Sequence, residues 1–271
     1  MLTSFKFKVP GDDASALPFM HDMAITRDYS IVVDNSYNFA LPIEGGEGPI
    51  LKFDENHNAK FGVIPRLATD ESQIIWLNLG EPLAINHICN AWQDPEDKDI
   101  IYLHAPIAYE AIDIFDHKGY QGRMTEFRID LRSKSVKKTD YSSELSVEFP
   151  RVRDELVGYP SRYGYTAQHG EGRTAIEGLV KWDLFERKPV GSFYYRNQGI
   201  GILGEPQFIP RRGGEHEDDG YLIVSVMEGE GGNEQTNLHV YNASSFSSVP
   251  LAVLPGVEKI PVGLHGYWKD L

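Results

Sequence analysis

Short apolar runs separated by polar segments recur along the whole chain. Eight such runs, rich in Val, Ile, Tyr and Phe as β-strands usually are, lie at 29–33, 74–77, 100–103, 124–131, 191–195, 221–226, 237–241 and 251–254. The segments between them carry Asp, Asn, Gly and Pro, which favour turns. No run of 12 residues shows helical periodicity. The pattern therefore predicts an all-β protein.

Many short strands at fairly even spacing are typical of a sandwich, a barrel or a propeller. A strand, an acidic turn and a second strand follow one another at 90–103 and again at 219–241, which favours the propeller. The sequence contains no domain linker, so we expect a single domain over residues 1–271. The segments 213–220 and 228–234 are interpreted as hairpin loops within it.

The composition narrows the possible partners. The chain has 271 residues and a net charge of −14, which disfavours nucleic acid because phosphate binding needs a basic surface. A single cysteine, Cys89, rules out an internal disulfide framework and fits a reducing compartment. No apolar run is long enough to span a membrane, and residues 1–8 lack the apolar core of a signal peptide. Peripheral membrane contact and the oligomeric state stay open.

Three histidines stand in distinctive contexts and are candidate metal ligands. His21, His87 and His265 lie in MHDMAIT, NHICNAW and GLHGYW, so only the tertiary fold could bring them together. Neutral imidazoles that converge usually bind Zn, Cu, Fe or Ni. Taken one at a time, each is better explained as a hydrogen-bonded core histidine. Of the others we expect exposed positions for 57, 117 and 216, a polar strand face for 239, burial for 104 and a loop for 169.

Two glutamates stand in apolar, Pro-flanked settings that suit burial. Glu148 lies in VEFPR and Glu205 in GEPQFIPR. A carboxylate that accepts the second N–H of a metal-bound imidazole fixes the ring. Either glutamate could equally form an ion pair with Arg151 or Arg211, and the sequence does not choose between the two roles.

Ten segments in the same order resemble the carotenoid cleavage oxygenase family. They are MHDMAITRDYSIVVD (20–34), KFGVIPR (60–66), NHICNAWQDPEDKDIIYLHA (86–105), TEFRIDL (125–131), EFPRV (148–152), RYGYTA (162–167), KWDLF (181–185), GEPQFIPR (204–211), EDDGYLIVSV (217–226) and GLHGYW (263–268). The resemblance implies a seven-bladed β-propeller with a non-haem Fe(II) ion held by four histidines.

The resemblance also assigns roles to residues of this chain. His21, His87 and His265 match the second, third and fourth iron ligands, Glu148 would orient His87, and Glu205 would orient His265. The first ligand histidine, its glutamate and about two blades have no counterpart, so the chain looks like the C-terminal part of such an enzyme, in which iron binding and turnover are weakened.

The implied reaction is cleavage of a conjugated C=C bond of a carotenoid, apocarotenoid or related polyene by O₂, giving carbonyl products. Candidates for an apolar tunnel around the lipophilic substrate are Phe149, Tyr163, Tyr165, Phe208 and Trp268. Four alternatives stay open: a non-catalytic homologue that binds a lipophilic ligand, a family isomerase, a three-histidine zinc hydrolase and a sandwich with ordinary histidines. The location is undetermined, and is cytoplasmic or plastid if a targeting segment precedes this sequence.

Overall fold

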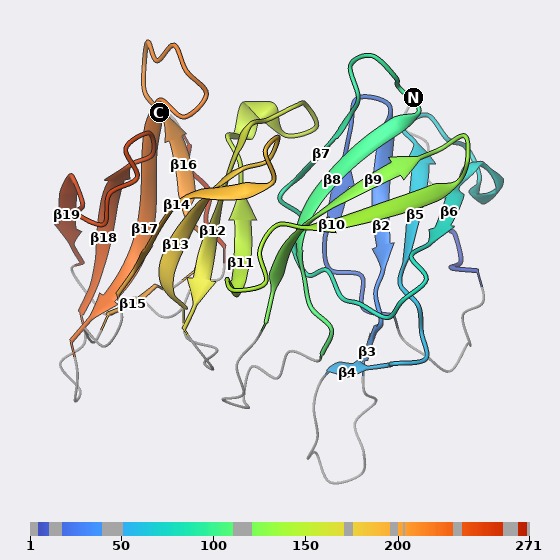
Figure 1. Cartoon of the computed structure of the whole chain (residues 1–271), viewed down its shortest axis with the longest axis horizontal. Coiled ribbons are helices and arrows are strands. Elements are labelled where there is room, and N and C mark those ends of the chain that lie inside the picture. The colour runs from blue at the N-terminus through green and yellow to red at the C-terminus, as the bar shows by residue number, and fades with distance from the viewer. Residues whose placement is uncertain are drawn as a thin grey trace, which may run out of the picture. The chain divides into compact units, whose positions relative to one another are not determined.

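The computed structural model is built from short antiparallel strands (Figure 1). It describes residues 5–10, 18–39, 51–110, 121–170, 176–195, 200–202, 204–229, 235–256 and 265–269. Helical turns in this part of the chain are two short 3-10 helices, Glu71–Gln73 and Asp154–Leu156. No helix among the described residues has the length and apolar character needed to cross a bilayer. The all-β fold class predicted from the sequence is confirmed.

The chain divides into two compact units. The first unit holds residues 1–117, 125–139 and 158–160, and the second holds 118–124, 140–157 and 161–271. The single domain expected from the sequence stays a prediction.

The first unit contains two four-stranded antiparallel sheets. One has the order β1-β2-β5-β6, with strands Met23–Ile25, Tyr29–Asp34, Lys60–Pro65 and Ile75–Asn78. The other has the order β10-β9-β8-β7, with strands Ser135–Asp140, Arg123–Asp130, Ile100–Ile107 and Asn90–Gln93. A small pair, β3 (Tyr37–Phe39) and β4 (Leu51–Phe53), accompanies them.

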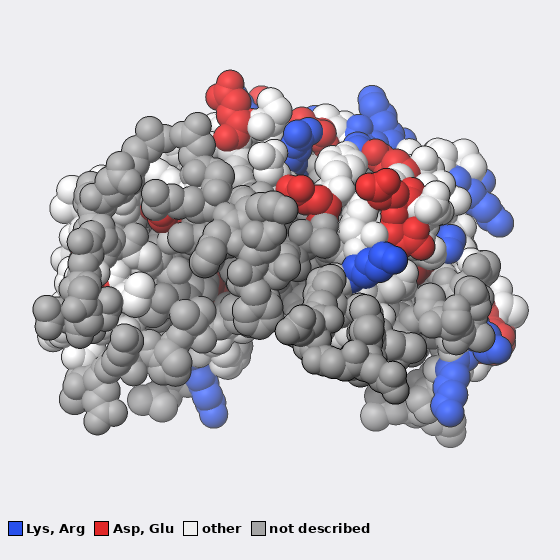
Figure 2. Space-filling view, turned by 90° about the horizontal axis from the view of Figure 1, so that it is seen from below, with Lys and Arg blue, Asp and Glu red and all other residues white. Residues whose placement is uncertain are grey.

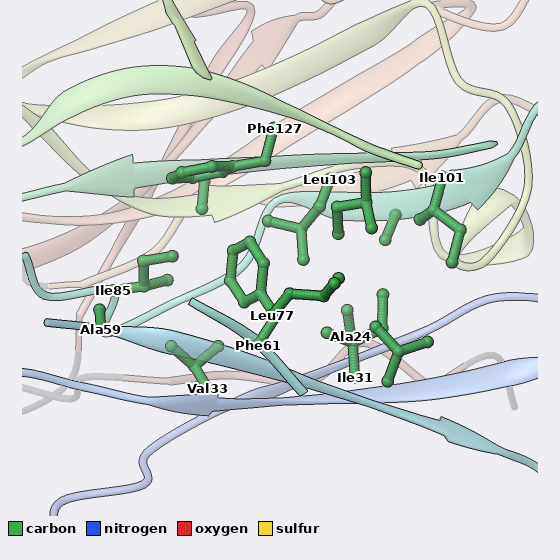
Figure 3. Close-up of a cluster of buried hydrophobic side chains, with 14 of the residues drawn as sticks. Ala24, Ile31, Val33, Ala59, Phe61, Leu77, Ile85, Ile101, Leu103 and Phe127 are labelled. Carbon is green, nitrogen blue, oxygen red and sulfur yellow. The ribbon is translucent and has the colours of Figure 1, made fainter. Parts of the chain in front are cut away.

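Apolar side chains of both sheets form the core of the first unit (Figure 3). The Phe61 and Phe127 rings meet edge to face with centroids 5.1 Å apart, and both are almost fully buried. Ile31 and Val33 of β2 supply one side of this core, and Ile101 and Leu103 of β8 the other. Burial of such side chains contributes roughly 1.5–3 kcal/mol each, so this packing holds β1 and β7 in place.

The second unit contains the other two sheets. One has the order β11-β12-β13-β14, with strands Val147–Arg151, Tyr163–His169, Ile176–Asp183 and Lys188–Tyr194. The other has the order β15-β17-β18-β19, with β16 also paired to β17; the strands are Ile200–Ile202, Gly220–Glu228, Gln235–Asn242, Ala252–Pro255 and Gln207–Pro210. The buried ring of Tyr165 stacks on Phe208 with centroids 5.5 Å apart, and these rings join the two sheets in one core.

The hairpin expected at 213–220 is confirmed, because it connects β16 to β17 and these strands pair antiparallel. The loop expected at 228–234 joins the antiparallel strands β17 and β18, although residues 230–234 lie outside the described part. On the face in Figure 2, some of the described Lys and Arg side chains lie beside Asp and Glu side chains and others stand apart from them.

Candidate metal centre

His21 and His87 face each other in the first unit. His21 lies two residues before β1 and His87 three residues before β7, so each stands just ahead of a strand. Their Nε2 atoms are 3.3 Å apart, and their rings meet edge to face at 5.0 Å. Two nitrogens at this separation can both lie about 2.1 Å from one ion, at an angle of roughly 100°. The pair therefore has a geometry that suits two ligands of one metal.

An aromatic ring lies against one face of His21, which is otherwise exposed. Phe19 stacks on its imidazole with centroids 5.0 Å apart and an angle of 24° between the planes. The N–H of Phe19 donates to the carbonyl oxygen of Tyr37, which ties the segment to β3. The imidazole is thus held by the ring at its side.

His265 is held by Glu205 in the second unit. The Nδ1 atom of His265 lies 3.2 Å from Oε2 of Glu205, and the N–H of Gly266 donates to Oε1 at 3.1 Å. The Glu205 side chain is 7% exposed, whereas that of His265 is half exposed. With Nδ1 turned to the carboxylate, Nε2 is the nitrogen that can coordinate a metal, and the carboxylate fixes the orientation of the ring.

The described partners of Glu205 include His265 and neither of the two arginines considered for it. Its described partners are His265, Gly266 and Gln207, whose Nε2 donates to Oε1 at 2.6 Å. Arg151 donates to Gln207 at 3.3 Å and pairs with Asp154 at 3.2 Å. Arg211 pairs with Asp219 instead, at 3.5 Å. Glu205 therefore supports the histidine and forms an ion pair with neither arginine.

Glu148 lies at an irregularity of β11. The register against β12 shifts between Glu148 and Arg151, and Phe149 has a φ of 53°, in the left-handed region that L residues rarely adopt. Glu148 is buried, and the N–H of Phe149 donates to its carboxylate. The Phe149 ring meets His265 edge to face with centroids 5.9 Å apart. The bulge directs this ring against the candidate ligand; strained backbone of this kind often marks functional sites.

The candidate residues thus fall into two groups. The first unit pairs His21 with His87, and the second joins His265 with Glu205 and Phe149 and buries Glu148. Imidazole nitrogens backed by carboxylates are a donor set that suits iron, and also zinc, copper or nickel. The residues present therefore fit an Fe(II) ion.

The remaining histidines lie in ordinary structural settings, some of them not as expected. His104 is buried and stacks on Trp92, as predicted. His216 is exposed, as predicted, and His117 lies outside the described residues. The exposed position expected for His57 is wrong, because it lies 2.9 Å from the buried carboxylate of Asp34.

The loop position expected for His169 is wrong, whereas His239 lies on the strand face opposite Leu238 and Val240, as expected. His169 is the last residue of β12 rather than part of a loop. His239 is buried and bonds through Nδ1 to the Tyr241 hydroxyl at 2.9 Å. Both belong to the strands of the second unit and not to the candidate ligand set.

The aromatic candidates for a substrate tunnel separate in the same way. Tyr165 and Phe208 stack in the core of the second unit, so they serve packing. The Tyr163 ring lies under the Lys181 ammonium at 4.4 Å. Phe149 touches His265, and Trp268 is 48% exposed near it in sequence. Of the five, Phe149 has direct contact with a candidate ligand.

Sequence reasoning missed three residues that surround the histidines: Phe19, Asn35 and Gln207. Phe19 could have been noticed from its position two residues before His21. Asn35 bonds to the segment ahead of His21, and Gln207 bonds to Glu205, the partner of His265; the Asn35 bond depends on the tertiary fold. Nothing in their local sequence indicates that role.

Comparison with known proteins gives consistent matches. The family model described as retinal pigment epithelial membrane protein matches residues 2–270. A carotenoid 9,10(9',10')-cleavage dioxygenase of Crocus sativus is 30% identical over 93% of this chain and 48% of its own length. A zeaxanthin 7,8(7',8')-cleavage dioxygenase of the same plant is 32% identical over 97% of this chain and 69% of its own length.

The fold matches as well. The crystal structure of cobalt-substituted Synechocystis ACO superposes with a TM-score of 0.80 at 26% identity, covering 94% of this chain and 53% of the other. This confirms the predicted propeller of the carotenoid-oxygenase type, of which the chain represents a part. The chain spans about half the length of most relatives it matches.

Proposed function

Since the chain belongs to the retinal pigment epithelial membrane protein family, whose members include carotenoid cleavage dioxygenases, we propose that it supplies ligands to a non-haem Fe(II) centre. We further propose that the protein cleaves a conjugated C=C bond of a carotenoid or apocarotenoid. The relatives named above act on substrates of this class.

Three imidazoles would hold the iron. His21 and His87 would ligate through Nε2, and the 3.3 Å separation of these two atoms is the observation that carries the proposal. His265 would be the third ligand, again through Nε2, because Nδ1 faces Glu205. Glu148 is proposed to orient His87 in the same way. Neutral ligands leave the full charge of the ion available, in contrast to sites with a ligating carboxylate.

The bound iron would supply activation of O₂ for oxidative cleavage of the polyene, giving two carbonyl products. The protein would supply position and environment. Glu205 accepts the Nδ1 proton of His265 and so maintains one tautomer and one ring orientation. The Phe149 ring beside His265 and the Phe19 ring beside His21 would offer apolar contact to a lipophilic polyene.

Iron stoichiometry tests this proposal directly. The purified chain is loaded anaerobically with Fe(II), desalted and analysed for metal, beside His21→Ala, His87→Ala and His265→Ala. We expect near-stoichiometric iron that is lost in each variant. The matched control is His216→Ala, a histidine in an exposed turn, which should keep its iron. Iron that survives all three substitutions would overturn the ligand assignment.

A product assay separates cleavage from binding without chemistry. The iron-loaded chain is incubated with an apocarotenoid aldehyde and O₂, and shorter carbonyl products are sought by mass spectrometry. Products that depend on all three histidines support an oxygenase. A chain that binds the polyene and iron but forms no product supports the non-catalytic alternative.

A further inference from the structure

Hydrogen bonds from one buried amide hold the segments ahead of His21 and His87 together. Asn35 follows β2 and is 1% exposed. Its Nδ2 donates to the carbonyl oxygens of Phe19 at 3.1 Å and Ile85 at 2.9 Å, and its Oδ1 accepts from the N–H of Ile85 at 2.8 Å. Phe19 lies two residues before His21, and Ile85 two residues before His87. Asn35 therefore joins the two segments at equivalent positions.

A carboxylate joins the same segments on the other side of the histidines. Oδ2 of Asp22 accepts from the N–H of Ile88 at 2.8 Å, and Oδ1 accepts from the N–H of Met23 at 2.7 Å. Asp22 follows His21 directly, and Ile88 follows His87 directly. Each histidine is thus flanked by hydrogen bonds on both sides, and we name Asn35 and Asp22 together the histidine bracket.

The residue types match the groups that they contact. Two carbonyl oxygens and one N–H converge on Asn35, and a primary amide offers donors and an acceptor at one branch point. An aspartate at this position would place a carboxylate oxygen beside two carbonyl oxygens, and these would lose the N–H group that donates to them. Asp22 faces two N–H groups, which need acceptors, and a carboxylate supplies two oxygens.

The histidine bracket connects two segments that no backbone hydrogen bonds of a shared sheet connect. β1 and β7 belong to different sheets of the first unit, so no strand pairing fixes His21 relative to His87. We propose that Asn35 and Asp22 are positioning residues that set the separation of the two Nε2 atoms before a metal binds. This inference rests on the proposed function. A separation that is fixed in advance favours metal binding because less conformational entropy is lost when the two histidines become ligands.

The far ends of the same strands provide a matched control. Gln93, the last residue of β7, accepts from Thr26 Oγ1 at 3.2 Å and from the N–H of Asp28 at 3.0 Å, and donates to Asp28 Oδ2 at 3.1 Å. It joins the end of β1 to the end of β7, away from the histidines. The same change from an amide to a carboxylate can therefore be made at two places. Asn35→Asp alters the histidine bracket, and Gln93→Glu alters the connection at the other ends of β1 and β7.

The experiment measures cobalt binding and the metal-free imidazoles in the full chain. Co(II) titration followed by visible spectra reports affinity and ligand geometry, and NMR of the imidazole nitrogens reports His21 and His87 without metal. We expect Asn35→Asp and Asp22→Ala to weaken Co(II) binding about tenfold or more, as loss of supporting groups does, and to shift both imidazole signals. Asp22→Asn keeps an acceptor for Ile88 and should recover most of the affinity, and Gln93→Glu should leave both readouts near wild type.

Each outcome bears on one of the two claims. If the wild-type chain binds Co(II) and the bracket variants behave like Gln93→Glu, the bracket inference is wrong and the metal site stands. If the wild-type chain binds no Co(II), the proposed metal function fails, and the metal-free imidazole signals decide the bracket: unchanged signals in Asp22→Ala overturn it. Asp22 is less buried than Asn35, so its variants keep the test valid if Asn35→Asp fails to fold.

Discussion

The Oε2 atom of Glu205 lies 3.2 Å from Nδ1 of His265, and the N–H of the next residue, Gly266, donates to Oε1 of the same carboxylate. The carboxylate thus holds both the ring and the backbone that carries it. Gln207 adds a third donor at 2.6 Å. Three donors around one buried carboxylate leave little freedom for the imidazole to turn.

Replacing Glu205 with glutamine should weaken metal binding. The amide keeps one acceptor oxygen, and its NH₂ group would face a donor, so the His265 ring loses its fixed orientation. We expect affinity for Fe(II) or Co(II) to fall about 10- to 100-fold, measured by competition with a chromophoric chelator. The control is Glu155→Gln, on an exposed side chain paired with Arg153. Equal losses in both variants would contradict the supporting role.

The left-handed backbone of Phe149 predicts an unusual order of stabilities. At a φ of 53°, glycine avoids the strain of a Cβ atom, so Phe149→Gly should be more stable than Phe149→Ala by about 1 kcal/mol. Urea unfolding measures both. At Phe208, inside β16, the order should reverse because glycine weakens strand interiors. The same order at both positions would argue against backbone strain at Phe149.

The strands were predictable because they depend on local composition. The runs at 29–33 and 100–103 became β2 and β8, with Ile31 and Ile101 in the core. The assignment of the three histidines as ligands stays a prediction, which rests on the motif in which each of them lies. The division of the three histidines between two compact units had no counterpart in the sequence pattern.

The polar core of the second unit could not be predicted. Alternation along β18 places Leu238 and Val240 on one face and His239 on the other, which predicted a polar face without indicating what covers it. The structure buries His239 and Tyr241 and leaves the aliphatic residues partly exposed. The Nδ1 atom of His239 bonds to the Tyr241 hydroxyl, and its Nε2 atom lies 3.4 Å from Oε1 of Glu228, a residue of β17. Alternation identifies two faces but not what covers each of them.

The role of Asn35 in the histidine bracket could not be predicted from local sequence either. Its partners Phe19 and Ile85 lie 16 and 50 residues away. Only the packing of β2 against both histidine segments defines the need for an amide. Local propensity predicts a turn at an asparagine after a strand, and gives no information on three long-range bonds.

Two tyrosines of the second unit should respond oppositely to loss of the hydroxyl. The buried Tyr165 hydroxyl has no hydrogen-bond partner among the described residues, so Tyr165→Phe should raise the free energy of unfolding by about 1 kcal/mol. The Tyr241 hydroxyl bonds to His239 and Tyr195, so Tyr241→Phe should lower it by about 1–2 kcal/mol. Urea unfolding of both variants checks the signs. A loss of stability in Tyr165→Phe would show that its hydroxyl is satisfied in solution.

Glu217 predicts a pH dependence of the second unit. Burial raises the pKa of its carboxyl, although the N–H groups of Arg162 and Tyr163 donate to it at 2.9 and 2.7 Å. The folded state then binds the proton more tightly than the unfolded state, whose pKa is about 4.3. Stability from this group is therefore full below the unfolded pKa and is lost as pH rises through the raised folded pKa.

Glu217→Gln removes the titration, so the free energy of unfolding of this variant should fall less steeply than that of wild type as pH rises between the two pKa values. The variant should also be less stable overall, because an amide oxygen satisfies only one of the two N–H groups. Urea unfolding at a series of pH values measures the slopes, with Glu186→Gln, an exposed site, as the control that should keep the wild-type slope. If the free energy of unfolding of Glu217→Gln depended on pH as steeply as that of wild type, Glu217 would not be the source of the pH dependence.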